Sequence, residues 1–443
     1  MQLLKRILSC FLFLLLFNAY LLISLIPFTP AFLLILMLLA YYFYKNIGIS
    51  FRSTQLGRLG ALGIGYELAL AAVLCSSLEI LVYSGIFLFR LPFSLLVLVI
   101  NAIGCFFLGF VMMCNGVIRI IICSRQLSIL IRILMLLLWW VPILNFVLLG
   151  YFLLLASEEY EYAIDRQQLN MDRQRDQLCS TKYPLLMVHG FGFRDWENFN
   201  YWGRIPDELK DNGAQIHYGG QQSSAPLEQC AQELRQRLTD IMAQTGCEKV
   251  NIIAHSKGGL DSRYMISCLS MGSHVASLTT INTPHRGCSY IPHILKKIPK
   301  RTVAFVDNRY RDIFTKLGDS APDLLGGLQD LTDIQCRRLN KLMRDDERVV
   351  YQSVGSRMRS ARSGYFPHNV GYSVIRRYGG GDNDGVVATQ SMEWGNFLGI
   401  ISPKGRHGIC HGDMIDLTRS NIEGFDVCEF YIDLVHKLKL RGL

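Results

Sequence analysis

The sequence predicts two parts of different fold class: an all-α transmembrane region, then an α/β domain with a mostly parallel sheet and helices on both faces. Three observations lead to this prediction. Half of the 443 residues are hydrophobic, and residues 7–156 carry few charges, whereas charges are frequent from Ser157 onward. After residue 183, short apolar runs alternate with amphipathic helical segments. Finally, a glycine-flanked serine follows one of those apolar runs.

These observations divide the chain into a transmembrane region (1–156), a polar linker (157–182) and a domain (183–443) of suitable size for one α/β unit. The net charge of +9 comes from scattered Lys and Arg without interleaved aromatic residues, which argues against a nucleic-acid partner. The thirteen cysteines include no C-x-x-C pair, so a zinc ribbon or thioredoxin-type site is not expected. Eight of them follow the apolar region and could form disulfides outside the cell.

Five membrane spans are expected. Residues 7–44 carry no charge and, at 1.5 Å per residue, form a run nearly twice as long as a hydrocarbon core. The sequence IPFTP at Ile26–Pro30 breaks this run, which predicts a helical hairpin. We place the spans near residues 7–26, 30–44, 60–89, 91–118 and 133–156. A cleaved signal peptide is the alternative for the first span, although no clear small-residue cleavage site follows it.

The distribution of basic residues predicts the orientation of these spans. The N-terminus carries Lys5 and Arg6, and the loops 45–59 and 119–132 carry three basic residues each, whereas the alternate loops contain Arg90 alone. By the positive-inside rule the N-terminus is then cytoplasmic. Five crossings of the plasma membrane would place the C-terminal domain on the extracytoplasmic face. A short second segment that failed to span would reverse this orientation.

Two carboxylates, Glu67 and Glu79, fall inside the third predicted span. An intramembrane carboxylate often marks a functional site. Because no intramembrane Lys or Arg is available as a partner, we expect each to lie near an interface or on a tilted helix. The simplest role for the region is that of an anchor.

The C-terminal domain should contain several strands buried in a parallel sheet, because their apolar runs are uninterrupted. We expect strands in Tyr183–Gly192, Ala214–Gly220, Lys249–Ser256, Val275–Pro284 and Val349–Ser356, and helices in Pro226–Gly246, after Ser256 and in Gly424–Leu440. An insertion at about residues 285–348 mixes cations with apolar segments, and its length favours a lid or binding cap. The alternative is a peripheral helix pair that only packs.

The segment VNIIAHSKGGLDSRY, Val250–Tyr264, combines a strand, a tight turn and a helix. Such a turn exposes a serine at its tip in front of a helix N-terminus, as a nucleophile requires. It also demands small residues two before and two after the serine, here Ala254 and Gly258. We therefore expect Ser256 to be a nucleophile in an elbow formed by Ala254, His255 and Gly258. The alternative is a serine that only caps the helix.

An oxyanion hole needs two N–H donors, one from the residue after the nucleophile and one from the loop after an earlier strand. Lys257 follows Ser256, and the loop HGFG at His189–Gly192 follows the first strand. Phe191 is the expected donor in this loop. We expect His189 to hold the loop in place.

The acid and the base should follow the serine in the order Asp, His. The glycine-rich turn GGGDNDGVV offers Asp382 and Asp384, and the segment HGICHGDMIDL offers His407 and His411. Composition alone does not decide within either pair.

Together, VHGFG, AHSKGG, TPHRG, NDGVV and HGDMID resemble the motifs of the secreted bacterial triacylglycerol lipases, over about residues 180–420. The resemblance implies an α/β-hydrolase fold with Ser256, Asp384 and His411 as catalytic triad. It favours Asp384, which matches the N-D-G motif, and His411, which is followed two residues later by an aspartate. The resemblance also suggests a structural calcium ion held partly by Asp413. The other ligands of this ion cannot be identified from the sequence, so no cofactor is expected. The membrane region departs from these secreted enzymes.

The expected function is a membrane-anchored serine hydrolase that cleaves carboxylic (acyl) esters of lipids through an acyl-enzyme, of the triacylglycerol lipase or carboxylesterase type. The alternative is an acyltransferase or phospholipase that uses the same triad. A third reading, from another class, is a non-catalytic membrane module.

Overall fold

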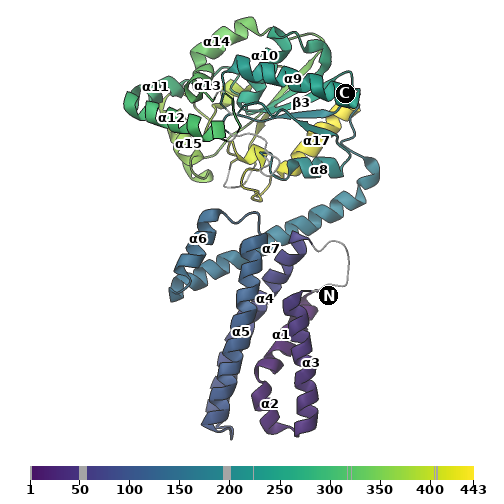
Figure 1. Cartoon of the computed structure of the whole chain (residues 1–443), viewed down its shortest axis with the longest axis vertical. Helices are drawn as coiled ribbons and strands as arrows, with labels where there is room; N and C mark the ends of the chain where they lie inside the picture. Colours follow the sequence, from purple (N-terminus) through teal and green to yellow (C-terminus); the bar gives the residue numbers. More distant parts are fainter. Residues whose placement is uncertain are drawn as a thin grey trace. The chain divides into compact units, whose positions relative to one another are not determined.

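The computed structural model describes residues 2–48, 57–192, 201–222, 224–316, 318–320, 322–403, 405 and 408–443. It forms two compact units, Met1–Gln168 and Leu169–Leu443 (Figure 1). His407, and Arg52 in the basic loop 45–59, lie outside the described residues.

The regular structure of the N-terminal unit, over its described residues 2–48 and 57–168, consists of helices. Its helices are α1 (Gln2–Phe17), α2 (Ala19–Leu25), α3 (Phe28–Ile47), α4 (Arg58–Leu88), α5 (Leu95–Cys123), α6 (Ile129–Leu138) and α7 (Pro142–Asp172). Four helical segments are long and apolar enough to cross a membrane: Thr29–Ile47, Arg58–Leu88, Leu95–Cys123 and Ile143–Asp172. The pair α1–α2, bent by 67°, passes the same test together. The predicted break at residues 26–30 therefore falls where α2 gives way to α3.

At the end of this unit the helices have other bounds than the sequence predicts. The expected span 133–156 is divided between α6 and α7, because Pro142 cannot continue a helix and instead begins the next one. The expected linker 157–182 is helical as far as Asp172, since residues 157–172 contain no Gly or Pro and are rich in helix-forming side chains. Beyond it, Cys179 is fully buried in the core of the C-terminal unit.

Helices α4 and α5 pack closely through small residues. A Cβ atom on Gly116 would lie 2.8 Å from the carbonyl oxygen of Gly65 and 2.7 Å from the backbone nitrogen of Ala69. Such close approach of backbones is typical of helix pairs in membranes. Glu79 of α4 is buried and accepts a 2.7 Å hydrogen bond from Asn18, at the break between α1 and α2. The side-chain amide of Asn18 is therefore the hydrogen-bond partner of Glu79, for which the sequence offers no intramembrane Lys or Arg.

The C-terminal unit contains one six-stranded, fully parallel sheet in the order β2-β1-β3-β4-β5-β6. Its strands are β1 (Leu185–Val188), β2 (Ile216–Tyr218), β3 (Val250–His255), β4 (Val275–Ile281), β5 (Val350–Ser356) and β6 (Asn396–Ile401). Helices α8 (Ile205–Asp211), α9 (Leu227–Thr245), α10 (Lys257–Cys268), α15 (His368–Arg377), α16 (Thr389–Met392) and α17 (Val427–Leu440) accompany it. Short 3₁₀ turns occur at Gln174–Asp176, Gly272–His274, Ala361–Ser363 and Asp413–Ile415.

Both faces of this sheet are covered by helices, as the sequence predicts. Alternate side chains of β1 point to opposite faces. Leu185 and Met187 share one apolar cluster with α8 and α17, whereas Leu186 and Val188 share another with α9 and α10. The uninterrupted apolar run of β1 therefore follows from burial on both sides.

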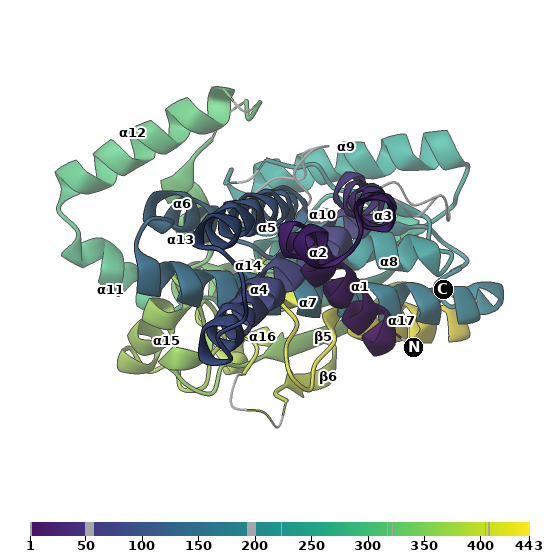
Figure 2. The same ribbon diagram turned by 90° about the horizontal axis from the view of Figure 1, so that it is seen from below.

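The insertion between β4 and β5 contains four helices rather than a pair: α11 (Tyr290–Lys297), α12 (Lys300–Lys316), α13 (Leu324–Asp330) and α14 (Asp333–Leu342). Helix α14 packs into an apolar cluster through Cys336 and Leu339. Helix α12 lies at the edge of its unit in both ribbon views (Figure 2). Its side chains Phe305, Val306 and Ile313 are 62%, 47% and 53% exposed, so this helix presents apolar groups to its surroundings.

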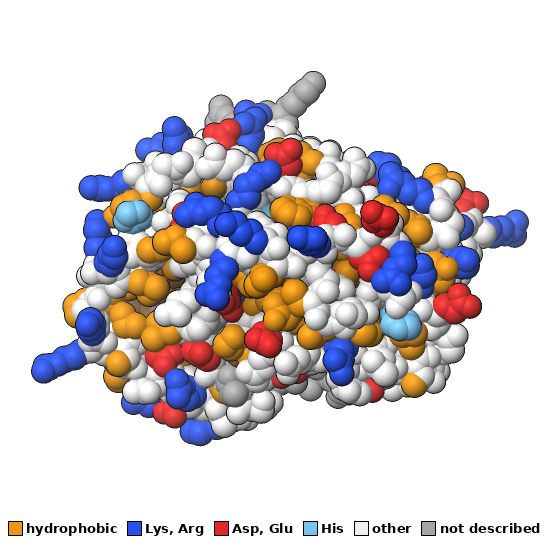
Figure 3. All heavy atoms as spheres, turned by 90° about the horizontal axis from the view of Figure 1, so that it is seen from above, with side chains coloured by type: hydrophobic (Ala, Val, Ile, Leu, Met, Phe, Trp, Pro, Cys, Tyr) orange, Lys and Arg blue, Asp and Glu red, His pale blue; other side chains and the backbone are white. Residues whose placement is uncertain are grey.

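Figure 3 shows Lys and Arg scattered among Asp and Glu over the face seen from above, without a continuous basic patch.

We expect Gly116→Leu to destabilise the α4–α5 pair, because the new side chain has no room against Gly65 and Ala69. Overpacking of this kind costs about 1–3 kcal/mol, and thermal unfolding of the detergent-solubilised protein would measure it. Gly104→Leu is the matched control, since a Cβ on Gly104 of the same helix meets no atom within 4 Å. Equal melting temperatures for the two variants would contradict the close packing.

Candidate active site

Ser256 occupies a strained turn between β3 and α10. Its backbone has φ 54° and ψ −129°, a conformation that residues with a side chain rarely adopt. The turn is fixed by hydrogen bonds from the Ser256 N–H to the Ile281 carbonyl (2.9 Å) and from the Thr283 hydroxyl to the Ser256 carbonyl (2.8 Å). This geometry is the one expected of a nucleophile elbow.

The small residues around Ser256 are required by close contacts. A Cβ on Gly258 would clash with the carbonyl oxygen of His189. A Cβ on Gly190 would lie 2.9 Å from the Cβ of Ser256. Ala254 is fully buried and pairs in register with Val188 of β1. The sequence argument for small residues at Ala254 and Gly258 is thus matched by the packing.

His411 and Asp384 are hydrogen-bonded, with 2.6 Å between Nδ1 and Oδ2. Asp384 lies in the loop after β5, and His411 in the segment after β6. The ring of His411 lies 4.4 Å, centroid to centroid, from the ring of His255, the residue before Ser256. The fold therefore brings the two residues favoured by the family motifs to the turn that carries the serine.

The carboxylate of Asp384 is fully buried and accepts three further hydrogen bonds. Oδ1 accepts from the backbone N–H groups of Val386 (2.8 Å) and Val387 (2.7 Å), and Oδ2 also accepts from the amide of Asn282 (2.8 Å). These donors stabilise the ionised carboxylate and fix its orientation toward His411. Sequence reasoning missed Asn282; its position directly after β4, near the edge where β3 ends, was the available signal.

The alternative acid is placed differently. Asp382 is half exposed and pairs with Arg357 at 2.6 Å. The alternative histidine, His407, is outside the described residues. Within the described part of the chain, only Asp384 of the aspartate pair contacts the histidine.

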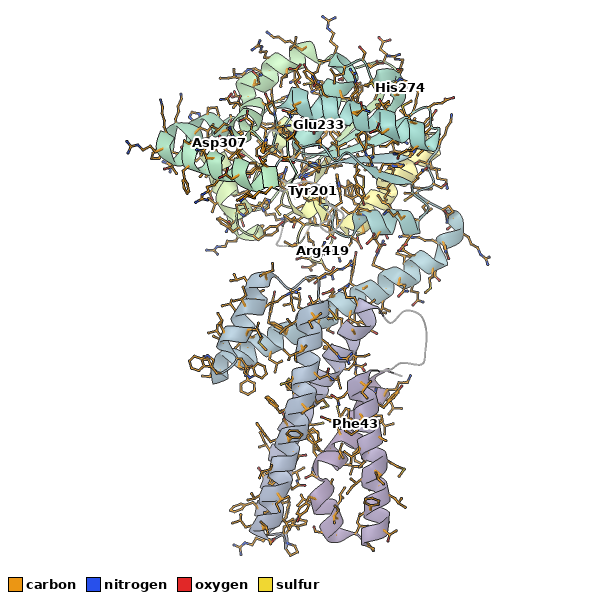
Figure 4. The ribbon with its side chains drawn as sticks, in the orientation of Figure 1. Phe43, Tyr201, Glu233, His274, Asp307 and Arg419 are labelled. Carbon is orange, nitrogen blue, oxygen red and sulfur yellow. The ribbon has the colours of Figure 1, made fainter. Side chains whose placement is uncertain are left out.

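His255 and Tyr201 form a second polar contact beside the elbow. The Tyr201 hydroxyl lies 2.7 Å from Nδ1 of His255, and Figure 4 shows Tyr201 inside the C-terminal unit. Burial, together with the neighbouring His411, lowers the pKa of His255 well below its ordinary range. A neutral His255 adds no charge that would oppose a positive His411. The sequence indicated His255 only as a member of the elbow, and its contact with Tyr201 could not be foreseen.

The first of the two expected oxyanion donors, Lys257, directly follows the Ser256 turn. Lys257 is the first residue of α10, so its N–H has no acceptor within the helix. Its side chain is buried and donates to Asp261 at 2.6 Å, which leaves the ammonium group away from solvent. Burial raises the pKa of Asp261 to about 6, and Lys257 acts in the opposite direction. This pair anchors the first turn of α10.

The loop after β1 contains Phe191, which is partly buried against Gly327 of α13. His189 is buried, with Nε2 2.9 Å from the Gln221 carbonyl oxygen, and Gln221 donates back to the His189 carbonyl at 3.0 Å. The expectation that His189 holds the loop agrees with these contacts. Phe191 and Lys257 remain predictions as oxyanion donors.

The calcium suggested by the family resemblance does not fit the residues present. No group of three or more His, Cys, Asp or Glu that could hold a metal occurs among the described residues. Asp413 accepts a 2.7 Å hydrogen bond from the backbone of Cys410, and the neighbouring Asp416 is engaged by Arg204 at 2.8 Å through both oxygens. The carboxylates near Asp413 are therefore satisfied by protein groups.

Known proteins resemble this part of the chain. The family model for the α/β hydrolase fold matches residues 183–357. The C-terminal unit is an α/β-hydrolase domain. Triacylglycerol lipases of Pseudarthrobacter phenanthrenivorans and Burkholderia plantarii are each 33% identical to the chain over 178 residues, which cover 38% of this chain and 55% and 49% of theirs. The chain thus spans about half the length of these curated relatives.

Among solved structures, the Staphylococcus hyicus lipase is 17% identical, with a TM-score of 0.44, and the match covers 59% of this chain and 98% of that one. The family model and the sequence relatives thus agree on an α/β-hydrolase fold that is similar to triacylglycerol lipases. Residues before 183 lie outside the match to the family model.

The hydrolase domain should lose stability in acid through His368. Burial lowers the pKa of this histidine from 6.5 to about 4, with His411 acting in the same direction. Between these two values the unfolded chain binds a proton that the folded domain does not, so stability falls as pH falls, by about 1.4 kcal/mol per pH unit.

His368→Gln should therefore flatten the decline in stability between pH 6.5 and 4. Thermal unfolding of the solubilised protein across this range measures the effect, with the wild type as reference. Because His255 contributes in the same direction, part of the decline should persist. Parallel curves for variant and wild type would refute the role of His368.

Proposed function

We propose that the chain is a membrane-anchored serine hydrolase that cleaves carboxylic ester bonds of lipids, with Ser256, Asp384 and His411 as its triad. The observation that carries the proposal is the 2.6 Å contact between His411 Nδ1 and a buried Asp384 carboxylate, beside the strained Ser256 turn. In a hydrolase domain related to lipases, this arrangement provides the parts of an acyl-transfer site.

Each residue has a distinct role in this mechanism. Nε2 of His411 takes the proton of Ser256 as the hydroxyl oxygen attacks the ester carbonyl, and Asp384 stabilises the resulting imidazolium. The N–H groups of Lys257 and Phe191 hold the oxyanion of the tetrahedral intermediate. His411 then protonates the leaving alcohol, and the acyl group remains on Ser256. Water, activated by the same histidine, releases the carboxylic acid.

Two features favour a lipid ester as substrate. The relatives named above are triacylglycerol lipases. The exposed apolar side chains of α12, together with cations such as Lys300 and Arg301, suit contact with a lipid interface. We infer that α12 belongs to a lid or cap of the domain, and that the apolar helices of the N-terminal unit hold the domain at the plasma membrane. The face on which it works depends on whether α7 crosses the bilayer.

Ser256→Ala should lower turnover of p-nitrophenyl esters by roughly three orders of magnitude or more, because the variant lacks the hydroxyl on which the proposed acyl-enzyme forms. The assay uses the full-length solubilised protein and esters of increasing chain length.

Serine-dependent hydrolysis of long-chain esters supports the lipase type, and activity confined to short-chain esters supports an esterase. Ester products formed with an added alcohol would point to acyl transfer. An unchanged rate in the variant, or no labelling of Ser256 by a fluorophosphonate, would reject the proposal in favour of a non-catalytic module.

Asp384→Asn and Asp382→Asn form a matched pair, since both replace a carboxylate by an amide in the same turn. At position 384 the amide oxygen would face the N–H groups of Val386 and Val387, which leaves the amide nitrogen toward His411. The histidine would then hold its proton on Nε2 and could not accept that of Ser256. We expect turnover to fall by about 10²–10⁴-fold for Asp384→Asn and to stay within twofold for Asp382→Asn. Equal effects would refute Asp384 as the acid.

A further inference from the structure

The end of α5 and the middle of α7 are joined by a buried carboxylate. Glu159 is 5% exposed. Its oxygens accept hydrogen bonds from the Ser124 hydroxyl (2.7 Å), the Arg125 backbone N–H (3.0 Å) and the guanidinium of Arg58 (2.7 Å). Arg58 begins α4 and Ser124 follows α5, so Glu159 lies at the end of the helix pair where α4 starts and α5 stops.

The chain between Ser124 and Glu159 must therefore start and finish at the same end of the α4–α5 pair. It leaves at Ser124, passes through α6 and the first half of α7, and arrives back at Glu159. Helix α6 is about 15 Å long, half the thickness of a hydrocarbon core of about 30 Å. The apolar part of α7, residues 142–156, is about 22 Å long. In Figures 1 and 2, α7 runs across α4 and α5 rather than alongside them.

Helix α6 and residues 142–156 of α7 form a helical hairpin. Although both helices are short, this hairpin presents a large apolar surface. Trp140, at the turn between its two helices, is 77% exposed. Further exposed side chains on it are Ile129 (76%), Leu130 (65%), Leu136 (69%), Leu137 (62%), Ile143 (82%), Phe146 (71%), Val147 (63%) and Leu154 (66%). An apolar surface of this kind, with Trp side chains at its turn, fits the boundary between lipid head groups and acyl chains.

We propose that α6 and the apolar half of α7 form a re-entrant hairpin, which enters one leaflet of the bilayer and returns to the same side. The membrane is then crossed by α1–α2 together, α3, α4 and α5. Four crossings place the hydrolase domain on the same side as the N-terminus. The chain beyond Glu159 carries Glu161, Asp165 and Arg166, which keep it out of the hydrocarbon as it leads to the domain.

Further contacts group the helix ends on that side. The guanidinium of Arg119, near the end of α5, donates to the carbonyls of Asn46 (2.9 Å) and Ile47 (3.1 Å) at the end of α3. Arg6 of α1 lies 4.0 Å from Glu67, in the first half of α4. The N-terminus, the end of α3, the start of α4 and the end of α5 therefore share one side.

The basic residues identify this side as the cytoplasm. Those at the shared side, among the described residues, are Lys5, Arg6, Lys45, Arg58, Arg119, Arg125 and Arg132. The connection between α4 and α5 on the opposite side carries Arg90. The positive-inside rule therefore places the shared side, and the hydrolase domain with it, in the cytoplasm. All thirteen cysteines are free thiols, as is usual in a reducing compartment.

This orientation differs from the one expected from sequence, where residues 133–156 counted as a fifth crossing. Insofar as the proposed ester hydrolysis is correct, its substrates are lipids of the cytoplasmic leaflet. The orientation itself does not depend on the catalytic assignment, and a Ser256→Ala chain should show the same topology.

The test fuses two reporters to Leu443 of the full chain in a bacterial host: green fluorescent protein, which fluoresces only in the cytoplasm, and alkaline phosphatase, which is active only outside it. We expect fluorescence without phosphatase activity at Leu443, at equal expression of both fusions. Alkaline phosphatase inserted after Leu91, in the connection between α4 and α5, is the matched control and should be active. An active phosphatase at Leu443 would overturn the proposal.

A second measurement needs no reporter. Protease added to inverted membrane vesicles should digest the hydrolase domain of the otherwise unmodified chain, followed through a short C-terminal tag, whereas protease added to intact spheroplasts should leave it whole. Digestion in spheroplasts would show that α7 crosses the bilayer and that the hairpin does not exist.

Discussion

The candidate site depends on the backbone turn at Ser256. A φ of 54° at a residue with a side chain is unfavourable, and the fold holds it through neighbours that leave no alternative. Gly258 lies against the carbonyl of His189, and Thr283 bonds the carbonyl of Ser256. The strands on both sides of β3 thus contribute to the turn. The strain fixes the hydroxyl at the carboxyl edge of the sheet, where ligands of parallel α/β sheets bind.

Asp384 and His411, the proposed acid and base, reach the same edge from strands further along the sheet. Asp384 follows β5 and His411 follows β6, so each lies beyond the carboxyl end of its strand. Asn282, directly after β4, bonds both Asp384 and Ser356 at the end of β5. The amide of Asn282, next to the strand that pairs with β3, therefore holds the loop that carries Asp384 against the end of β5. The site is held together by backbone and side-chain hydrogen bonds, which keep the buried carboxylate in place.

Sequence reasoning succeeded where a local pattern determines local geometry. The strand, the small residues around Ser256 and the helix behind it follow from one short segment, and the alternating apolar runs predicted the covered parallel sheet. It failed where contacts join distant parts of the chain. Neither the bond between Tyr201 and His255 nor that between Glu159 and Ser124 leaves a periodic signal. Hydropathy gave the apolar run 133–156 as one span, because it does not record the hydrogen bonds that hold Glu159 near Ser124.

The cluster around Glu159 determines more than local packing. A buried carboxylate needs several donors, and removal of its cation typically costs about 3–5 kcal/mol. Here the donors come from the start of α4 and the segment after α5, so the α7 backbone cannot leave that end of the helix pair without breaking all of these bonds. In the proposed topology one glutamate thereby sets the number of crossings, and with it the side of the membrane on which the hydrolase domain lies. A chain that lost this cluster could keep an intact Ser256 turn and still meet a different leaflet.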